Sequence, residues 1–561
     1  MTQLNPSRTS GINTAALLLG GCMFASGACG VILEYIQAAM ASMILGNSFE
    51  QWAMVIGLML FWMGIGSLIQ TRIPKGALIY VFIGIETALA LAGGFSPTLT
   101  YLSFGYTGHY RIVLYGFVSL IGILIGLEIP VIIRINNDYS KELSTNLGHI
   151  LSADYIGSLV GALIYVYVLL RYFPITEGAF LTAGMNFSLA LVTFIYFARK
   201  GMVGRPWTIA LVMGFTALAL FTGFTRGQEW QIKLEQPLYD DPVVYSQTSR
   251  YQHIVITRFE PLNETRLFLN GNLQLNSLDE ARYHESLVHP VMNLVPRHGR
   301  VLILGGGDGC ALREILKYPD VESVTLVDLD PAMTQLASTH PLLTAVNDNA
   351  FKDARVTTVT GDGLSQGPIK PVRVEAPAPP GQVRFREVAS VQVMNIDADL
   401  FLSQTSDFYD VIIVDMPDPS SPELVKLYSR GFYAKIRRRL SQTGMMVVQA
   451  TSPYFAKEAY LCIGRTLGAA GFSILPFHEN VPSFGDWGFY LAFHPQLDRK
   501  RLEQEMDQME IPVETRFLTP RVFQRQRIFG KGMLETRRTG VNTLSHPLLL
   551  TLYNVESWLL E

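Results

Sequence analysis

Residues Arg300–Gly309 have the sequence RVLILGGGDG, a mostly apolar run followed by four glycines in five positions. The apolar run predicts a short buried strand over Arg300–Leu304, and a helix is expected to begin at Cys310. Glycines at a strand-to-helix turn let a ligand come close to the backbone and to the helix amino terminus. The stretch therefore predicts an α/β domain that binds a ligand beside this turn.

A second predicted strand, Ser323–Val327, ends in Asp328, nineteen residues after Gly309. An acid at the end of the second strand accepts hydrogen bonds from ribose hydroxyls, which indicates a nucleoside site. The turn lacks the G-x-G-x-x-G spacing, and Asp308 places a negative charge where a pyrophosphate would lie. A dinucleotide is therefore disfavoured, and a nucleoside with a positive charge, such as a sulfonium, fits better. The alternative is a glycine turn that binds nothing.

A later apolar run, Tyr409–Val414, leads into Asp415-Met416-Pro417-Asp418-Pro419. Open α/β sheets bind ligands at the carboxyl ends of their strands, where this pair of carboxylates would lie. One carboxylate of such a pair can hold an ammonium while the other accepts a proton from an attacking nitrogen. The pair therefore indicates an amine substrate, and the alternative is a solvated turn rich in Asp and Pro.

The segment before the glycine turn predicts a small β-sheet and one helix. Ile254–Arg258, Arg266–Leu269 and Gly271–Leu275 have strand composition, and Asn-Gly between the last two predicts a hairpin. Ser277–His289 has helical character, with a predicted capping box formed by Ser277 and Glu280. Residues 225–250 carry charge and two prolines and are expected to form a linker.

The amino-terminal part is far more apolar than the rest. The whole chain is 49% hydrophobic and 16% charged with a net charge of −3, which does not favour nucleic-acid binding. Its four cysteines form no CxxC pair, so neither a disulfide framework nor a zinc site is indicated. A membrane span needs about 20 apolar residues. Seven segments qualify: 13–36, 51–70, 76–95, 112–134, 152–172, 177–197 and 206–224.

These seven segments predict a multi-pass helical bundle in a lipid bilayer. Glycines in Gly57–Gly66 and Gly157–Gly161 should allow close helix packing. Four acids fall within or at the ends of the apolar runs: Glu34, Glu86, Glu128 and Asp154. Acids inside a membrane are costly, so they suggest a path for a cationic amine, whereas a position near the interface would explain them without a function.

Taken together, residues 250–495 resemble the polyamine aminopropyltransferases, typified by spermidine synthase. The resemblance rests on Leu269–Glu285, Val301–Tyr318, Val321–Asp330, Tyr409–Pro419 and Pro482–Ala492. The architecture resembles the membrane-fused bacterial members of that family. It implies a transmembrane bundle over 1–224, a linker and β-rich part over 225–290, a Rossmann-like, class I methyltransferase-type catalytic domain over 291–495, and a tail over 496–561.

The resemblance also implies roles for individual residues. Those implied to bind the nucleoside donor are Gln252, Gln274, Asp308 and Asp328. Tyr283 and His284 match the pair beside the aminopropyl chain and the acceptor; Asp415 matches the proton acceptor and Asp418 the acid that holds the acceptor amine. Two pairs compete for the adenine amino group, Asp362-Gly363 and Asp397-Ala398, and the spacing slightly favours Asp397.

The implied reaction is attack by putrescine on decarboxylated S-adenosylmethionine, giving spermidine and methylthioadenosine without a cofactor or metal. Three features depart from the family pattern: Met416-Pro417 between the acids with an unusual Ser420–Tyr428 after them, Asp328 where Glu is usual, and an extra segment that includes Pro368–Gly381. The first departure leaves the acceptor open. The alternatives are an S-adenosylmethionine-dependent methyltransferase and a nucleoside-sensing pseudo-enzyme coupled to a transport-like bundle.

The distribution of positive charge and the source of the substrate predict opposite orientations of the chain in the inner membrane. The amino-terminal tail and the second, fourth and sixth loops carry most of the Lys and Arg, which would place them in the cytoplasm and the carboxyl-terminal domain outside. The nucleoside donor, however, is made in the cytosol, so we expect a cytoplasmic catalytic domain. The expected partners are a diamine, the nucleoside donor and lipid, and the chain could form a homo-oligomer.

Overall fold

The computed structural model describes residues 14–45, 48–137, 143–359, 372–376, 384–388 and 390–554. The chain divides into two units, Met1–Arg250 and Tyr251–Glu561. The apolar segments belong to the first unit and the glycine turn to the second.

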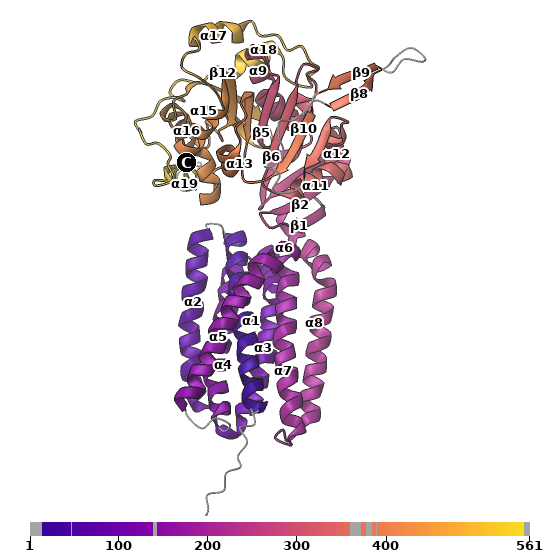
Figure 1. The fold of residues 1–561 in the computed structure, drawn as a ribbon, viewed down its shortest axis with the longest axis vertical. Helices are drawn as coiled ribbons and strands as arrows, with labels where there is room; N and C mark the ends of the chain where they lie inside the picture. The colour runs from indigo at the N-terminus through magenta and orange to yellow at the C-terminus, as the bar shows by residue number, and fades with distance from the viewer. Residues whose placement is uncertain are drawn as a thin grey trace, which may run out of the picture. The chain divides into compact units, whose positions relative to one another are not determined.

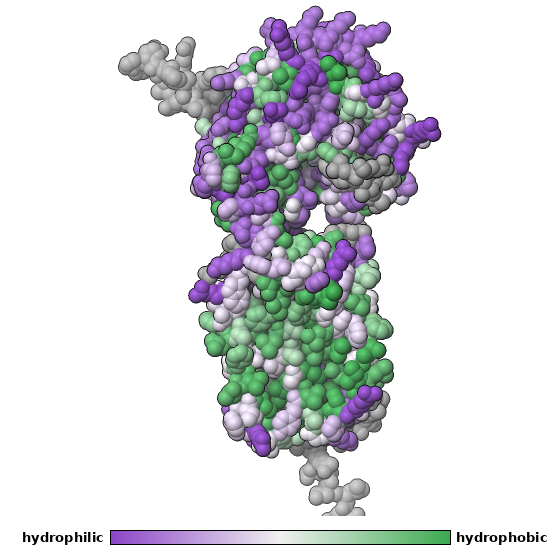
Figure 2. All heavy atoms as spheres, turned by 180° about the vertical axis from the view of Figure 1, so that it is seen from behind, coloured by the Kyte–Doolittle hydropathy of each residue, from purple (hydrophilic) through white to green (hydrophobic). Residues whose placement is uncertain are grey.

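Seven long helices make up most of the first unit: α1 (Thr14–Leu45), α2 (Ser48–Ile69), α3 (Leu78–Tyr106), α4 (Tyr110–Asn136), α5 (Leu143–Ile164), α7 (Ile175–Arg199) and α8 (Pro206–Glu235). They run side by side (Figure 1), and apolar side chains cover most of the face of the unit that Figure 2 shows. By length and composition all seven could cross a membrane. Each predicted apolar segment is therefore a helix, and a short π-helical stretch (Tyr165–Leu169) and α6 (Leu170–Tyr172) follow α5.

Glycines bring these helices together at some of the predicted positions. A Cβ on Gly157 would lie 1.9 Å from the Phe24 carbonyl oxygen, and a Cβ on Gly66 would lie 2.2 Å from the Ile123 carbonyl oxygen. A Cβ on Gly57, by contrast, would meet no atom within 4 Å outside the local backbone of its own helix. Glycine therefore allows backbone contact between α1 and α5 and between α2 and α4, because any larger residue would push the pairs apart.

The end of the first unit differs from the predicted linker. Helix α8 continues to Glu235, and a 3-10 turn (Gln236–Leu238) and strand β1 (Val243–Thr248) follow. The charged residues after 224 therefore extend a helix instead of ending it.

Three antiparallel strands open the second unit: β2 (His253–Phe259), β3 (Glu264–Leu269) and β4 (Asn272–Asn276). The predicted hairpin is confirmed. Its turn residues Asn270 and Gly271 have φ of 51° and 80°, as a turn of the type I′ class requires at both central positions.

Helix α9 (Glu280–Leu294) begins later than predicted, and the capping box is wrong. The Ser277 hydroxyl accepts a hydrogen bond from the Thr265 backbone amide at 2.9 Å, so it faces the sheet instead of capping the helix. Asp279 is the N-cap residue and makes no side-chain cap. Glu280 instead forms an ion pair with Arg313, which a buried carboxylate needs more than a capping partner.

The second unit is built on an eight-stranded sheet of order β13-β14-β12-β11-β5-β6-β10-β7. Its strands are β5 (Arg300–Gly305), β6 (Ser323–Asp328), β7 (Val356–Val359), β10 (Ser390–Asn395), β11 (Tyr409–Asp415), β12 (Leu440–Gln449), β13 (Ser473–Val481) and β14 (Gly485–Phe493). The strands from β12 to β7 are parallel, and β14 and β13 add an antiparallel hairpin. The predicted strands of the nucleoside domain are confirmed.

Both faces of this sheet are buried, which explains why its strands are almost continuously apolar. Along β11, Ile412 and Val414 point into one core and Val411 and Ile413 into the other. The first core is closed by α13 (Ala398–Gln404), α15 (Arg430–Arg439), α16 (Lys457–Ala469) and α19 (Leu548–Asn554). The second is closed by α9, α10 (Cys310–Ile315), α17 (Arg499–Asp507) and α18 (Pro520–Gln526).

The chain leaves β5 toward β6 on one side and returns to β11 on the other. Asp415 at the end of β11 lies opposite Gly305 at the end of β5. Ligands of open α/β sheets bind where the strand order reverses in this way. The fold therefore brings the glycine turn and the DMPDP segment to one edge. The extra segment contributes the hairpin of β8 (Val372–Ala376) and β9 (Arg384–Val388), drawn apart from the sheet in Figure 1.

Candidate active site

The glycine turn packs directly on the end of β11. Gly305 has φ of +86°, and a Cβ there would lie 1.9 Å from the Asp415 carbonyl oxygen. The Gly306 amide donates a hydrogen bond to that same oxygen at 3.2 Å. Position 305 therefore requires glycine for two reasons. Its backbone is left-handed, and a side chain would prevent the contact that holds Asp415 beside the turn.

Asp328 lies against the middle of the same turn. Its Oδ2 accepts a hydrogen bond from the Gly307 amide at 3.0 Å, and its Oδ1 accepts one from the Asp330 amide at 2.8 Å. Burial, with further contributions from the charges of Asp330 and Asp308, raises the pKa of Asp328 to about 7. A ligand that donates hydrogen bonds to this carboxylate would favour its charged form.

Asp415 is oriented by an aromatic hydroxyl from α9. The Tyr283 hydroxyl donates a hydrogen bond to Asp415 Oδ1 at 2.7 Å. Burial and the nearby charge of Asp308 raise the pKa of Asp415 to about 6, although His284 and the Tyr283 hydroxyl both favour its charged form. A carboxylate with such a pKa is still ionised at neutral pH but accepts a proton more readily than an exposed one.

His284 supplies a positive charge between these acids. Its Nε2 lies 4.0 Å from Asp308 Oδ1, and its Nδ1 lies 2.9 Å from Glu280 Oε2. Burial alone would lower the pKa of His284, but the hydrogen bond to Glu280 and the charge of Asp308 outweigh it, and the pKa rises to about 9. Glu280 is itself held by both terminal nitrogens of Arg313, at 3.0 and 2.9 Å. We therefore expect a cationic imidazole at neutral pH.

Asp418 has three side-chain donors around it. Its Oδ2 accepts hydrogen bonds from the Tyr553 hydroxyl at 2.7 Å and from Thr451 Oγ1 at 3.2 Å, and its Oδ1 accepts one from Gln449 Nε2 at 3.3 Å. Burial raises the pKa of Asp418 to about 6 in spite of these donors. Thr451 has φ of 59°, which is costly for a β-branched residue, and such strain is common where a side chain must be held for a function.

The remaining predicted residues are spread around this group. Gln252 Nε2 donates a hydrogen bond to Asp330 Oδ2 at 3.0 Å, two residues from Asp328. Gln274 lies on β4 and is partly exposed; in the described part of the chain no hydrogen bond joins it to the other predicted residues. Asp397 caps α13 through the amides of Asp399 and Leu400.

Of the two candidates for the adenine amino group, only Asp397-Ala398 lies within the described residues. Asp397 and the buried Ala398 follow β10, whose last residue pairs with Asp328, so Asp397 comes after the strand next to the ribose candidate. Its Oδ2 lies 2.6 Å from Lys426 Nζ. Asp362 and Gly363 lie outside the described residues. The preference for Asp397 therefore stays a prediction.

Comparison with known proteins gives the family. Residues 280–366 and 383–500 match the spermine/spermidine synthase domain. A polyamine aminopropyltransferase of Oceanobacillus iheyensis is 37% identical over 535 residues, 94% of this chain and 95% of that protein. Polyamine aminopropyltransferase 1 of Ralstonia nicotianae is 39% identical over 86% of this chain and 85% of its own, and the Leptospira interrogans enzyme is 36% identical over 94% and 96%.

The chain belongs to the polyamine aminopropyltransferase family. It is an enzyme of that class, so neither the methyltransferase nor the pseudo-enzyme alternative is needed. Matches over 94% of the chain include the helical unit as well as the catalytic one, so these relatives share both.

Three donors to Asp418 were not among the site residues predicted from the sequence, namely Gln449, Thr451 and Tyr553, and the most distant of them in sequence is Tyr553. It lies on α19, in the tail to which no role was assigned, and Leu549 and Leu552 of that helix are fully buried in the core. The two leucines at a spacing of three were the available signal for a packed helix. No sequence pattern connects Tyr553 with Asp418, because 135 residues separate them.

Some side chains of the site are close enough to share a metal ion. Donor atoms of His284, Asp308 and Asp415 lie within 4.8 Å of one another, and so do those of Glu280, His284 and Cys310. Arg313 already neutralises Glu280, and a cationic His284 is a poor ligand because metals bind the neutral imidazole. These residues suit a hydrogen-bonded charge network better than a metal centre.

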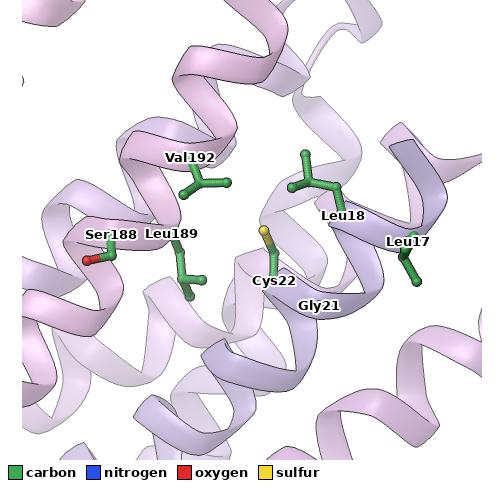
Figure 3. Close-up of a pocket in the computed structure, with 7 residues that line it drawn as sticks. All are labelled: Leu17, Leu18, Gly21, Cys22, Ser188, Leu189 and Val192. Carbon is green, nitrogen blue, oxygen red and sulfur yellow. The ribbon is translucent and has the colours of Figure 1, made fainter. Parts of the chain in front are cut away.

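A pocket of about 370 Å³ lies in the helical unit. Leucines and a valine of α1 and α7 face one another across it (Figure 3). It is lined by Leu17, Leu18, Gly21, Cys22, Ser188, Leu189 and Val192. An apolar lining of this kind does not suit a cationic substrate of an aminopropyltransferase.

Proposed function

We propose that this enzyme transfers the aminopropyl group of decarboxylated S-adenosylmethionine to putrescine, giving spermidine and methylthioadenosine. The observation that carries the proposal is the pair Asp415 and Asp418 at the switch point of the sheet, each with its own hydrogen-bond donors and beside a glycine turn that contains Asp308. The substrate has positive charge at its sulfonium and amine, which these carboxylates would attract.

On the donor side, Asp328 accepts hydrogen bonds from the ribose hydroxyls. Asp308 holds the amino group of the aminopropyl chain, and Asp397 is the better candidate for the adenine amino group. Gln252 supports Asp328 through Asp330, as its hydrogen bond to Asp330 suggests. The donor of a methyltransferase also carries a carboxylate, which Asp308 would repel.

On the acceptor side, Asp418 binds the distal ammonium of the diamine while Asp415 accepts a proton from the amine that attacks. The nitrogen lone pair forms a bond to the propyl carbon beside the sulfonium, the carbon–sulfur bond breaks, and its electron pair neutralises the sulfur. The proton of the attacking nitrogen passes to Asp415 and then to solvent. The sulfonium is already an activated leaving group, so we expect no resident metal or cofactor in this step.

Tyr283 and His284 act on Asp415 and Asp308 in this scheme. The Tyr283 hydroxyl fixes the orientation of the Asp415 carboxylate, and the cationic His284 favours the ionised form of Asp415 before substrates bind. The sequence between the two acids, Met416-Pro417, departs from the family pattern, so the choice of putrescine is a proposal to be tested against other diamines.

The test is a product assay on the purified full-length protein. With decarboxylated S-adenosylmethionine and putrescine we expect methylthioadenosine and spermidine in equal amounts, and lower rates with shorter or longer diamines. Asp415→Asn should lower kcat by about 10²- to 10⁴-fold with unchanged donor affinity. Asp399→Asn, which removes an acid paired with Lys435 outside the site, is the matched control and should keep its activity. The absence of product with every diamine, while the nucleoside still binds, would refute the proposal.

We also propose that the seven helices anchor the enzyme in the inner membrane with its catalytic unit in the cytoplasm. Their length and composition support insertion, and the cytosolic origin of the donor supports the orientation.

A further inference from the structure

Two glutamates face each other inside the helical unit. Glu86 of α3 and Glu128 of α4 are 0% and 1% exposed, and their carboxyl groups are within hydrogen-bonding reach of each other. Neither oxygen of Glu86 and only one oxygen of Glu128 receives a hydrogen bond from a donor. Among the described residues of this unit, no Lys, Arg or His side chain is buried. The pair thus has no positive partner from the described protein.

Neighbouring helices add polar groups at the same level. The Ser26 hydroxyl of α1 makes a hydrogen bond with Glu128. The carboxylate of Asp154 on α5 lies 2.6 Å from where a Cβ of Gly27 would stand, next to Ser26, and its charge acts on Glu128. Without a counter-ion, so much negative charge in an apolar bundle is strongly unfavourable.

An uncharged side chain gives an independent indication of a ligand. Asn186 of α7 is fully buried, and both its amide nitrogen and its amide oxygen lack a hydrogen-bond partner. A buried amide left unpaired in this way costs about 1–3 kcal/mol. Such a group is retained where something else satisfies it.

Contacts between α1 and α7 place Asn186 beside the acids. The backbone carbonyl oxygen of Thr182, one turn before Asn186, accepts a hydrogen bond from the Cys29 thiol at 4.0 Å. The hydroxyl of Thr193, two turns after Asn186, lies 3.7 Å from the Cys22 sulfur. Residues four and seven apart share one helix face, so Asn186 faces α1 between Cys22 and Cys29. Both cysteines are near enough to Glu128 to be affected by its charge.

We propose that Glu86, Glu128, Asn186 and Ser26 form a binding site for one protonated alkylamine inside the helical unit. A primary ammonium has one positive charge and three donors, which match the open carboxylate oxygens and the Asn186 amide oxygen. The family acts on polyamines, which carry such groups. The site goes beyond the proposed function, because it lies on helices that contribute no residue to the reaction.

Equilibrium binding of radiolabelled spermidine to the full-length protein in lipid nanodiscs tests this site. The unsubstituted protein should bind spermidine at two classes of site, one in each unit. In the double variant Glu86→Gln/Glu128→Gln, the spermidine affinity of the site in the helical unit should fall at least about tenfold. The reason is that a charge-assisted hydrogen bond contributes about 1.5–3 kcal/mol. Methylthioadenosine production should stay within about twofold of the parent.

Glu34→Gln is the matched control, because Glu34 is a partly exposed acid of α1 that is not part of this group. It should leave both classes of site unchanged. The proposal would be overturned if the parent and the double variant bound the same number of spermidine molecules. It would also be overturned if the site held sodium or protons that spermidine does not displace. Loss of the catalytic reaction alone would refute the proposed function and leave this site intact.

A second variant covers the case in which the double substitution prevents folding. Asn186→Leu keeps both carboxyls and removes only the unpaired amide, so the helices should pack at least as well. It should lower the spermidine affinity of the site in the helical unit about three- to tenfold, which is the effect of one lost hydrogen bond. Unchanged spermidine affinity in a folded Asn186→Leu protein would contradict the assignment of Asn186.

Discussion

Asp415 and Asp418 are three residues apart, yet the fold gives them different surroundings. Asp415 has one hydroxyl donor and a nearby imidazolium, whereas Asp418 has three neutral donors. A single strand end thereby supplies one acid suited to accept a proton and another suited to hold an ammonium.

These two acids predict the acid side of the pH profile. Both have a pKa raised to about 6, so below that pH each is increasingly protonated and loses its capacity to accept a proton or bind an ammonium. We expect kcat/KM for putrescine to fall as the pH decreases through about 6, with a slope greater than one because two groups titrate. Steady-state rates between pH 5 and 8 would check this. A profile that is flat down to about pH 4.5 would contradict it.

Tyr553→Phe should shift this acid limb to higher pH. The Tyr553 hydroxyl stabilises charged Asp418, so its removal raises the pKa of Asp418 further and leaves less of the ionised form at a given pH. KM for the diamine should rise about three- to tenfold near pH 7, the effect of one hydrogen bond to a charged group, with a smaller change in kcat. Two other donors remain on Asp418, which limits the loss.

Tyr454→Phe is the control for this substitution, because the Tyr454 side chain is 66% exposed. It should leave both KM and the acid limb unchanged. A purely structural role of Tyr553 would lower the thermal stability of Tyr553→Phe without moving the acid limb, and that result would refute the assignment.

At the scale of elements, the turn between β5 and α10 connects the donor and acceptor halves. Gly305 contacts the end of β11, and Gly307 contacts the carboxylate of Asp328 at the end of β6. The turn therefore contacts the ends of three strands. A substitution in the turn should lower donor affinity more than it lowers the stability of the sheet.

Gly307→Ala tests this turn. The added Cβ would lie 2.5 Å from Asp328 Oδ2, so Asp328 must move away from its hydrogen bond with the Gly307 amide. We expect donor affinity to fall about tenfold or more, since Asp328 loses its position for the ribose. Calorimetric titration with methylthioadenosine would measure it.

Gly468→Ala provides the comparison, because nothing lies within 4 Å of a Cβ on Gly468 in α16. Alanine in the last turn of this helix should leave nucleoside affinity unchanged and raise stability by at most about 0.5 kcal/mol, less than in a helix interior. Equal nucleoside affinity in Gly307→Ala and Gly468→Ala would mean that the turn does not position Asp328.

For the whole molecule, the seven helices predict stable membrane association. The protein should stay in the membrane pellet after alkaline carbonate extraction, because removing about 20 apolar residues per span from lipid is highly unfavourable. With seven spans and a cytoplasmic catalytic unit, the amino terminus lies outside. A fluorescent protein fused at the carboxyl terminus should fluoresce, and alkaline phosphatase fused there should be inactive. The opposite pair of results would place the catalytic unit outside and support the charge-based orientation.

Local pattern was enough for the elements of both units. The apolar runs predicted all seven helices, and the glycine turn, the Asn270-Gly271 hairpin and the strands before Asp328 and Asp415 were predicted correctly. The Ser277–Glu280 capping box failed because Glu280 has a stronger partner, Arg313, that comes 33 residues later. A local motif is overridden when a buried charge needs a distant counter-ion.

By itself the sequence determined the class of fold and placed the glycine turn and Asp415 at the ends of strands, because hydrophobic periodicity and turn chemistry act over a few residues. Only the tertiary structure decided what surrounds those acids. Tyr283, Tyr553 and Thr451 reach them from three separate segments of the chain, and Asn186 is buried in the helical unit without a hydrogen-bond partner. The pKa of each acid and the unpaired state of Asn186 depend on burial and on contacts between distant segments, and these exist only once the chain has folded.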